Sequence, residues 1–473
     1  MQNEQYKELY TLIKDAFIVM QELVNTNLKN QKYFQHHFEF PQLKGFNDNG
    51  MPWLSSYFFA NGPVDYSSIF KSSKDENYYE NIPAFQKILS YYTDNISDFM
   101  NHPYFSDVHK SDTFYRSIFA YNLLVMFDSY MHANNSSVFS EDVLREVVLK
   151  AFNRFFNEEL TINICIPILL IRFEKDEYTV SENIRVRRLS EQELISSYKI
   201  GGYSDTYELF VVSSATHVLE LQNYSLRNTP VHSSSAWDYI EAYPLNIIDR
   251  WFTAFRIITH YETGYGQILS FPVEWGIREG NLVEIHGVKI HKFPNDFVKE
   301  RKDTYPTPLV NATDLEKINR LFDFFMDNNA NSLNIALKRL NTSYLRENEE
   351  DTILDLMIGI ESLVTKDDRG EITYKVSTRT ALILSTLSQY PYSIAETKKA
   401  MNTIYSFRSK VVHGASTLEK SRVIKMREDI TVYSVDLARS ILEYLILAVA
   451  ENPVFLDPSN IDLFFLEDYE KKK

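Results

Sequence analysis

Apolar residues return every three or four positions at both ends of the chain, which is the spacing of one face of an α-helix. Residues 6–24 carry such a stripe, and we expect a helix there. Two further helices are predicted over 112–131 and 140–156, the second with Ser140 as its N-cap. Between about 35 and 110, Asn, Asp, Ser and Pro interrupt short aromatic runs, which favours irregular structure.

The pattern changes near residue 160, where β-branched residues replace the helical stripe. Thr161 to Phe173 is typical of a buried strand, and two shorter strands are expected over 178–180 and 184–189. Ser190 followed by Glu193 is a capping-box pattern that predicts the start of a helix. The rest of this middle segment predicts a strand over 207–221, a helix over 235–259, and a hairpin of 282–285 with 288–291 around Gly287.

Pro306 and Pro308 mark a second boundary, after which the pattern is almost entirely helical. The predicted helices are 313–328, 331–345, 350–364, 374–388, 394–413 and 422–451. The last carries an apolar stripe that can pack within one subunit or against a second one. We therefore predict a mainly α protein with an α+β middle region, divided into 1–157, 158–305 and 306–473.

Composition narrows the class of protein. The 473 residues carry a formal charge of −15, so most of the surface should repel a polyanion. The single cysteine, Cys165, excludes an intramolecular disulfide framework and a cysteine-based metal site, and its apolar surroundings predict an inert core thiol. We see no targeting segment and no apolar run long enough to span a bilayer, and we expect a soluble, cytoplasmic protein without membrane contact.

Other sites of chemistry are weakly indicated. His36 and His37, and likewise His286 and His291, lack a carboxylate or a further histidine at a recognisable ligand spacing, so we interpret them as surface or strand histidines. Gly264-Tyr265-Gly266 lacks the context of a phosphate-binding loop, and no nucleophile elbow is present. The sequence thus predicts neither a metal nor a cofactor.

One window of the acidic chain is strongly basic. Residues 398–427 hold eight Lys or Arg and one acid, Glu419, a local balance of +7. Inside it, Arg408 and His413 stand five positions apart, with Ser409 directly after the arginine and Gly414 directly after the histidine. An arginine that can grip a phosphate, beside a histidine that titrates near neutrality, suits the cutting of a phosphodiester. Basic residues are also favoured near helix ends simply because they complement the helix dipole.

The spacing itself raises a geometric problem. Five positions of an α-helix turn about 500°, so the two side chains point roughly 140° apart. Gly414 is a natural residue to end a helix, which would place His413 in a fraying last turn. Alternatively, each residue meets its counterpart from a second copy of the helix across a two-fold axis.

Glu361 is a candidate supporting residue. It stands at the edge of an apolar helix face, where an acid usually has a partner. Arg379 on the next helix and Arg408 are the candidate partners. A structural ion pair and a functional acid that orients Arg408 or tunes His413 both fit this pattern.

Three stretches together resemble a known family. Leu356 to Leu363, then Thr373 to Leu384 with Arg379, then Ile404 to Gly414 are similar in order and spacing to the ApeA-like branch of the HEPN superfamily. The resemblance covers about 150 residues of the C-terminal part, and implies a C-terminal HEPN helical bundle. HEPN domains commonly dimerise, which brings two copies of an Arg-x4–6-His motif into one cleft.

The resemblance also implies an activity. Active HEPN domains are metal-independent endoribonucleases, and several act as toxins or antiphage effectors that cut tRNA or other RNA. Arg408 would then stabilise the phosphate and His413 would move a proton during attack by the ribose 2′-OH, with Ser409, Glu361 and Arg379 in support. RNA would be held by the basic residues Lys398, Lys399, Lys410, Lys420 and Arg422.

From this we expect an RNA-cleaving, homodimeric effector of bacterial antiphage defence, whose N-terminal region senses a phage-derived trigger. The alternative is a catalytically inactive HEPN module that binds RNA, a nucleotide or a protein partner.

Overall fold

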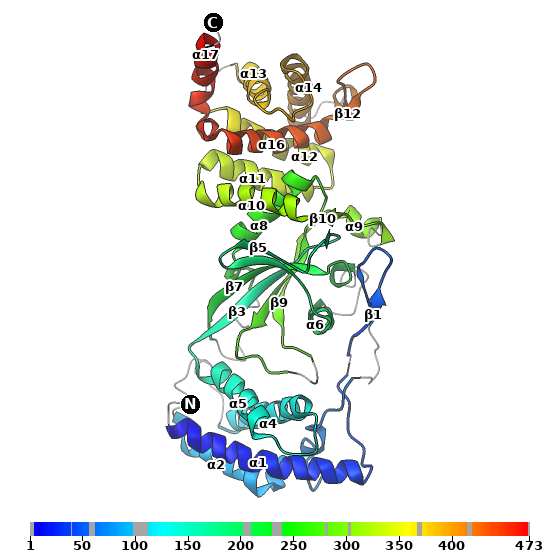
Figure 1. Ribbon diagram of the computed structural model, residues 1–473, viewed down its shortest axis with the longest axis vertical. Coiled ribbons are helices and arrows are strands. Elements are labelled where there is room, and N and C mark those ends of the chain that lie inside the picture. Colours follow the sequence, from blue (N-terminus) through cyan, green and yellow to red (C-terminus); the bar gives the residue numbers. More distant parts are fainter. Residues whose placement is uncertain are drawn as a thin grey trace. The chain divides into compact units, whose positions relative to one another are not determined.

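The fold is described from a computed structural model that covers residues 4–38, 40–55, 62–97, 112–201, 210–228, 239–278, 280, 282–300, 304–366, 371–413 and 419–471. The chain is mainly helical and contains a six-stranded sheet (Figure 1). It forms two compact units. The N-terminal unit comprises Met1–Tyr243, Tyr265–His291 and Asp303–Thr307, and the C-terminal unit comprises Pro244–Gly264, Lys292–Lys302 and Pro308–Lys473.

Four helices share one apolar core in the N-terminal unit. They are α1 (Glu4–Lys29), α2 (Pro83–Asp94), α4 (Asp112–Asn134) and α5 (Glu141–Phe156). The predicted stripe of the first helix is confirmed, because its apolar face is buried and Phe17 packs edge-on against Phe127 with ring centroids 5.1 Å apart. Ser140 caps α5 as predicted, since its hydroxyl accepts a hydrogen bond from the Val143 backbone N–H.

The sheet of this unit has the strand order β5-β6-β7-β3-β8-β9. Its strands are β3 (Glu159–Pro167), β5 (Glu177–Ser181), β6 (Ile184–Arg188), β7 (His217–Arg227), β8 (Tyr265–Pro272) and β9 (His286–Lys292). Central β3 runs antiparallel to both β7 and β8. The capping box predicted at Ser190 and Glu193 is confirmed at the start of α6 (Glu191–Gly201). Cys165 is fully buried in β3, and burial raises the pKa of its thiol.

Two short strands, β1 (Gln42–Phe46) and β2 (Pro52–Ser55), pair antiparallel before α2. A further short strand, β4 (Arg172–Phe173), takes up the end of the predicted strand that began at Thr161. That prediction was therefore too long, because the chain leaves β3 after Pro167.

In the middle segment, the strand predicted over 207–221 is confirmed only from His217 onward, and the predicted hairpin was wrong. Residues 210–212 are helical and the strand begins only at His217, while 207–209 lie outside the described residues. The expected hairpin around Gly287 is a single strand, β9, at the edge of the sheet. Gly287 makes no turn there. It permits close approach to the neighbouring strand, because an added Cβ would lie 2.2 Å from the Ile268 carbonyl oxygen.

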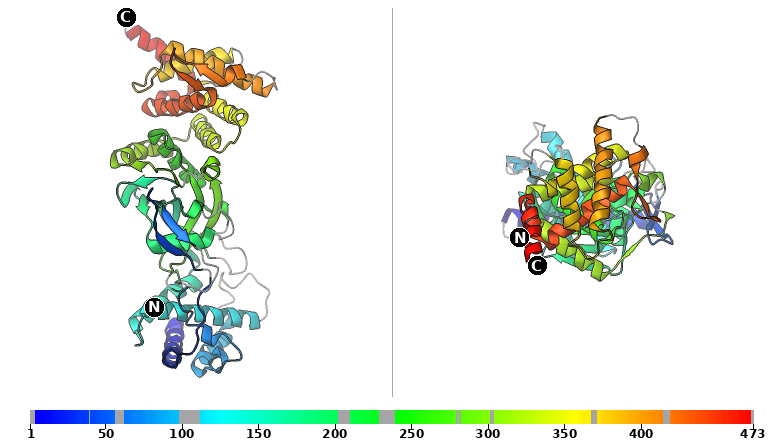
Figure 2. Two further views of the ribbon diagram at one scale, coloured as in Figure 1. Left: turned by 90° about the vertical axis from the view of Figure 1, so that its right-hand side faces the viewer. Right: turned by 90° about the horizontal axis from the view of Figure 1, so that it is seen from above.

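The C-terminal unit is a stack of helices. Its long helices are α8 (Leu245–Thr259), α10 (Ala312–Asp327), α11 (Asn331–Tyr344), α12 (Glu349–Val364), α13 (Ile372–Leu384), α14 (Ile394–Val412), α16 (Ser434–Glu451) and α17 (Ile461–Lys471). The buried helix α12 contacts α11, α13, α14 and α16. Figure 2 shows these helices, in yellow to red, from two further sides. Gly359 lets α16 come close, because an added Cβ would lie 2.7 Å from a methyl group of Leu442.

The last long helix predicted from the sequence begins too early. Residues 423–433 form an antiparallel hairpin of β11 (Val423–Lys425) and β12 (Thr431–Tyr433), preceded by the short helix α15 (Glu419–Arg422). Of the apolar residues at helical spacing in this stretch, Val423 and Tyr433 pair across the hairpin instead, and both residue types are favoured in strands. Helix α17 was not predicted.

The boundaries of the two units also differ from those of the three predicted regions. Helix α8, predicted within the middle region, belongs to the C-terminal unit, where it contacts α10 and α11. Its helix starts at Leu245 behind Pro244, so it is shorter than the predicted 235–259, of which 235–238 lie outside the described residues. Among the described residues, no helix is both long and apolar enough to cross a membrane.

Replacing Gly287 by alanine should destabilise the N-terminal unit, because the new methyl group must push the edge strand away from a backbone carbonyl. We expect a loss of about 1–3 kcal/mol in the free energy of unfolding, measured by urea denaturation. Gly45→Ala is the matched control, since Gly45 has a similar φ of 143° but nothing within 4 Å of the added Cβ. Equal losses for both variants would contradict this account.

Candidate functional site

Arg408 lies near the C-terminal end of α14, which is firmly anchored in the C-terminal unit. The helix starts with a capping box in which the Ser393 hydroxyl and the Glu396 carboxylate each accept a backbone N–H. Met401, Ile404 and Phe407 are buried on its inner face. Arg408 follows directly and is half-buried, with its guanidinium 5.8 Å from the centre of the Tyr405 ring.

Arg408 differs from the other arginines of this unit in having no bonded partner. Each other described arginine forms a hydrogen bond or an ion pair, namely Arg250, Arg256, Arg320, Arg339, Arg346, Arg379, Arg422, Arg427 and Arg439. Arg408 forms neither with any described residue, and its Nε is buried without a hydrogen-bond partner. Its guanidinium is therefore not committed to any described residue.

Glu361 on α12 provides the opposing charge, at a distance too long for a hydrogen bond. Its Oε1 is buried without a partner among the described residues. Burial raises the pKa of this carboxyl, and the nearby positive charge of Arg408 opposes that rise only in part. Of the two predicted partners, Arg408 is thus the one whose charge affects the pKa of Glu361.

Arg379 is committed elsewhere, so it was wrongly considered as a partner for Glu361. Its guanidinium binds both carboxylate oxygens of Asp462 on α17, at 3.0 and 2.6 Å, and donates to the Val364 carbonyl at 2.9 Å. It is buried, and it ties α13 to α17 and to the end of α12. This is a structural role.

His413 ends the helix, as predicted. It is the C-cap residue of α14, with φ −94° and ψ 5°, and its backbone N–H donates to the Ser409 carbonyl at 3.1 Å. The His413 side chain is exposed, and Ser409 is half-buried one turn before it. Gly414 lies outside the described residues. The structure therefore places an uncommitted arginine and an exposed histidine in the last turns of one helix.

The other predicted RNA-binding residues are less uniform than the sequence suggested. Lys399 is exposed, whereas Lys398 sits over the Tyr374 ring at 4.4 Å and Lys410 donates to the Ser421 hydroxyl at 2.6 Å. The Lys420 side chain lies outside the described residues. Arg422 is paired with Glu349 at 2.6 Å, so it is not a free cation.

Arg427 is likewise paired, with Glu396 at 2.7 Å. Glu349 lies outside the window of residues 398–427, and so does Glu396. The balance of +7 therefore overstates the local positive charge, because acids from other helices neutralise part of it.

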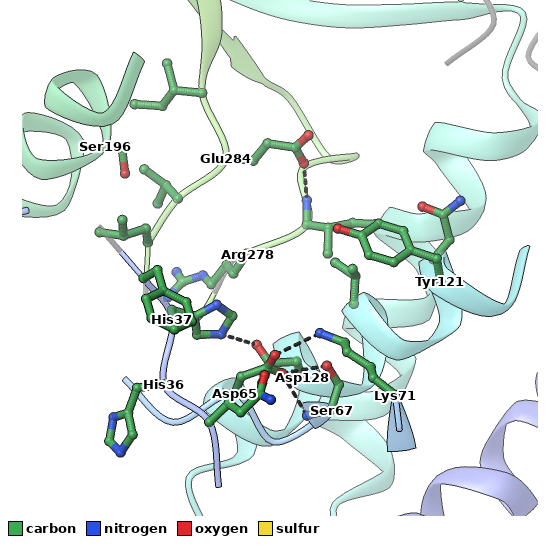
Figure 3. Close-up of a pocket in the computed structure, with 18 of the residues that line it drawn as sticks. His36, His37, Asp65, Ser67, Lys71, Tyr121, Asp128, Ser196, Arg278 and Glu284 are labelled. Atoms are coloured by element: carbon green, nitrogen blue, oxygen red, sulfur yellow. Dashed lines mark hydrogen bonds and ion pairs between the residues drawn. The ribbon is translucent and has the colours of Figure 1, made fainter. Parts of the chain in front are cut away.

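A second site, which sequence reasoning missed, lies in the N-terminal unit. It is a cavity of about 660 Å³ lined by residues from the α1–β1 loop, from α4 and from the segment before β9 (Figure 3). Charged side chains on its wall are mostly paired. Lys71 binds Asp65 at 2.8 Å, and Arg154 pairs with Glu284, which also accepts from His286 at 2.7 Å.

The electrostatics of this wall follow from these pairs. Burial raises the pKa of Glu284, but the charge of Arg154 and the hydrogen bond from His286 outweigh it and hold the pKa at about 2. Asp65 behaves similarly, since hydrogen bonds from Lys71 and Ser67 lower its pKa against the effect of burial. Both carboxylates are thus ionised at neutral pH.

His37 also lines this cavity, and its interpretation as a surface histidine without a carboxylate was wrong. Its Nε2 lies 3.0 Å from Asp128 Oδ2, and its side chain is only 13% exposed. Figure 3 shows the His37 ring turned toward Asp128, while His36 points away. Asp128 and His132 stand four apart on α4, a spacing that places both on one helix face and was visible in the sequence. His286 does lie in a strand, as predicted.

With both sites described, we compared the chain with protein-family models, with curated proteins and with solved structures, and nothing in these three comparisons matches it. The resemblance to HEPN domains therefore stays a prediction. The function has to be argued from the geometry of the sites.

The raised pKa of Glu361 gives a pH-dependent prediction. The folded protein holds this proton more tightly than the unfolded chain, whose carboxyl titrates near 4.5, so protonation stabilises the fold and this gain is lost as the pH rises through the folded pKa. Glu361→Gln removes the titration. Its stability relative to the parent should therefore increase as the pH rises above the unfolded pKa of 4.5, as measured by urea denaturation. Glu316→Gln, at an exposed site on α10, serves as the control. A gap that stays constant or narrows toward high pH would contradict the prediction.

Proposed function

We propose that the chain is a metal-independent endoribonuclease of the HEPN type, with Arg408 and His413 in its active centre. The observation that carries the proposal is the uncommitted guanidinium of Arg408, five positions before an exposed histidine on the same helix, in a unit whose other described arginines are all paired. Leaving an arginine unpaired in a half-buried place disfavours folding unless a ligand binds there. The planar fork of arginine matches the oxygens of a phosphate.

The reaction that these residues suit is internal transesterification of RNA. Neutral His413 takes the proton of a ribose 2′-OH as the oxygen attacks the adjacent phosphorus. Arg408 stabilises the negative charge that grows on the phosphate oxygens. The bond to the 5′-oxygen then breaks, this oxygen takes up a proton, and the products are a 2′,3′-cyclic phosphate and a 5′-hydroxyl. Glu361 acts on Arg408 through its charge, and orients the guanidinium.

A dimer would solve the problem of orientation. His413 leaves the helical path at the C-cap, and no hydrogen bond joins its side chain to that of Arg408. We propose that two chains place their α14 ends together, so that the arginine of one chain serves the histidine of its partner.

The biological setting follows from the resemblance alone. We propose that the nuclease acts in bacterial antiphage defence, and that the N-terminal unit responds to the trigger. The second candidate is an inactive HEPN module that binds RNA. The pairing of Arg422 and Arg427 with acids favours neither function over the other, and the experiment below separates them.

Arg408→Ala and His413→Ala should each slow RNA cleavage by about 100-fold or more, because one removes the phosphate ligand and the other the proton carrier. The measurement is the initial rate of cleavage of labelled tRNA and single-stranded RNA in EDTA. The ends of the products should be 2′,3′-cyclic phosphates.

Arg320→Ala is the control, since Arg320 is an exposed arginine on α10 of the same unit. Cleavage that survives both substitutions would overturn the assignment. A parent protein that binds RNA without cutting it, with weaker binding in Arg408→Ala, would instead establish the inactive module.

Mixing the two inactive variants tests the shared site. A heterodimer of Arg408→Ala with His413→Ala keeps one arginine and one histidine on different chains, so mixed samples should recover part of the activity. The check is the cleavage rate after mixing at constant total protein, compared with each variant alone. No recovery in samples that size-exclusion chromatography shows to be mixed dimers would place both residues in one chain.

A further inference from the structure

We propose that the N-terminal unit binds a divalent transition-metal ion, of which zinc is the best fit, between His37, Asp128 and His132. One nitrogen or oxygen atom from each of the three side chains lies within 4.8 Å of the others. The proposal concerns a different unit and a different chemistry from the proposed nuclease, and goes beyond it.

Local structure brings the three side chains together. Asp128 and His132 occupy successive turns of α4 and face the same side. The segment that carries His37 is held against residues 63–65 by backbone hydrogen bonds, from His37 N–H to the Pro63 carbonyl at 3.0 Å and from Asp65 N–H to the Gln35 carbonyl at 2.9 Å. His37 therefore reaches a position opposite α4 by chain pairing rather than by a flexible loop.

The distances suit a shared ion. Two ligand atoms, each about 2.0–2.2 Å from one ion, lie about 3–3.5 Å apart at right-angled or tetrahedral geometry. His37 Nε2 lies 3.0 Å from Asp128 Oδ2, and His132 Nε2 lies 3.6 Å from Asp128 Oδ1. The second distance is too long for a hydrogen bond but close to the separation of two ligands.

The surroundings resemble the outer shell of a metal site. The Tyr66 backbone N–H donates to Asp128 Oδ1 at 2.8 Å, which orients the carboxylate. The Val64 carbonyl oxygen accepts a hydrogen bond from His132 Nε2 at 2.9 Å, so this nitrogen would release its proton when it binds an ion. Asp128 is only 3% exposed, so its charge needs a neutralising partner.

The donor set selects the class of ion. Two imidazoles and one carboxylate suit zinc and its neighbours, whereas calcium and magnesium prefer oxygen ligands alone. Three protein ligands leave a further coordination position. His37 and Asp128 both line the cavity, so that position would face a space that also holds Arg278, which forms no hydrogen bond or ion pair with a described residue. An anionic small molecule fits such a place best.

The test measures metal and needs no enzymatic activity. The full chain is stripped with a chelator, desalted, and titrated with Zn²⁺ by calorimetry, and then with Co²⁺ to record the visible absorption of bound cobalt. We expect one ion per chain, and at least about tenfold weaker binding in His132→Asn and in Asp128→Asn. Metal content of the freshly purified protein is measured by mass spectrometry.

His36→Gln is the matched control. His36 is the sequence neighbour of His37, but its ring contacts the Gly62 carbonyl and lies outside the cluster of His37, Asp128 and His132. The His36→Gln variant should bind zinc like the parent. If Asp128→Asn fails to fold, His37→Gln replaces it, with circular dichroism to confirm folding. Binding of fewer than one ion per chain in the parent, or equal affinity in parent and His132→Asn, would overturn the proposal and leave a hydrogen-bonded network.

Discussion

The cost of leaving a charge unpaired away from water governs the C-terminal unit. Arginines of this unit reach across helices to carboxylates or carbonyls, as Arg379 does to Asp462 and Val364. These contacts join helices that lie far apart in the sequence. Arg408 is the exception among the described arginines, and the nearby Glu361 has a buried oxygen without a partner among the described residues. Arg408 and Glu361 therefore both depart from the rule that buried charges are paired. Such departures are typical of sites that bind a ligand.

The cost of an unpaired buried charge also shapes the N-terminal unit, where buried carboxylates are neutralised by nearby groups. Glu220 is buried in the sheet, and it is neutralised by Arg185 and Arg187 from the adjacent strand. Glu284 is neutralised by Arg154. Asp128 forms no ion pair with a lysine or arginine among the described residues. It meets two imidazoles and a backbone N–H, which are groups that also suit the first and outer shells of a metal ion.

The two proposals assign separate chemistry to the two units. The proposed nuclease centre would use an arginine and a histidine at a helix end, and would act on a phosphodiester without a metal. The cluster of His37, Asp128 and His132 would bind an ion beside a cavity large enough for a small molecule. A ligand-binding N-terminal unit agrees with a role for that unit in responding to a trigger, while the measurements for each site stand independently.

Local interactions are what the sequence determined by itself. Helical periodicity gave α1, α5 and most of the C-terminal helices, and the caps at Ser140 and Ser190 were visible because a cap joins residues three apart. The position of His413 at a helix end followed from the same local logic. Apolar spacing misled where it fitted two structures, so the hairpin of 423–433 was assigned to a helix.

Only the tertiary structure decided which charges are satisfied. Arg422 meets Glu349 across 73 positions, Arg379 meets Asp462 across 83, and His37 meets Asp128 across 91. No periodicity encodes such pairs, because they depend on how distant elements pack. The composition of the basic window was therefore a poor guide to its free charge. The uncommitted state of Arg408, on which the proposed function rests, emerged only when the other described arginines of its unit had been matched with partners in space.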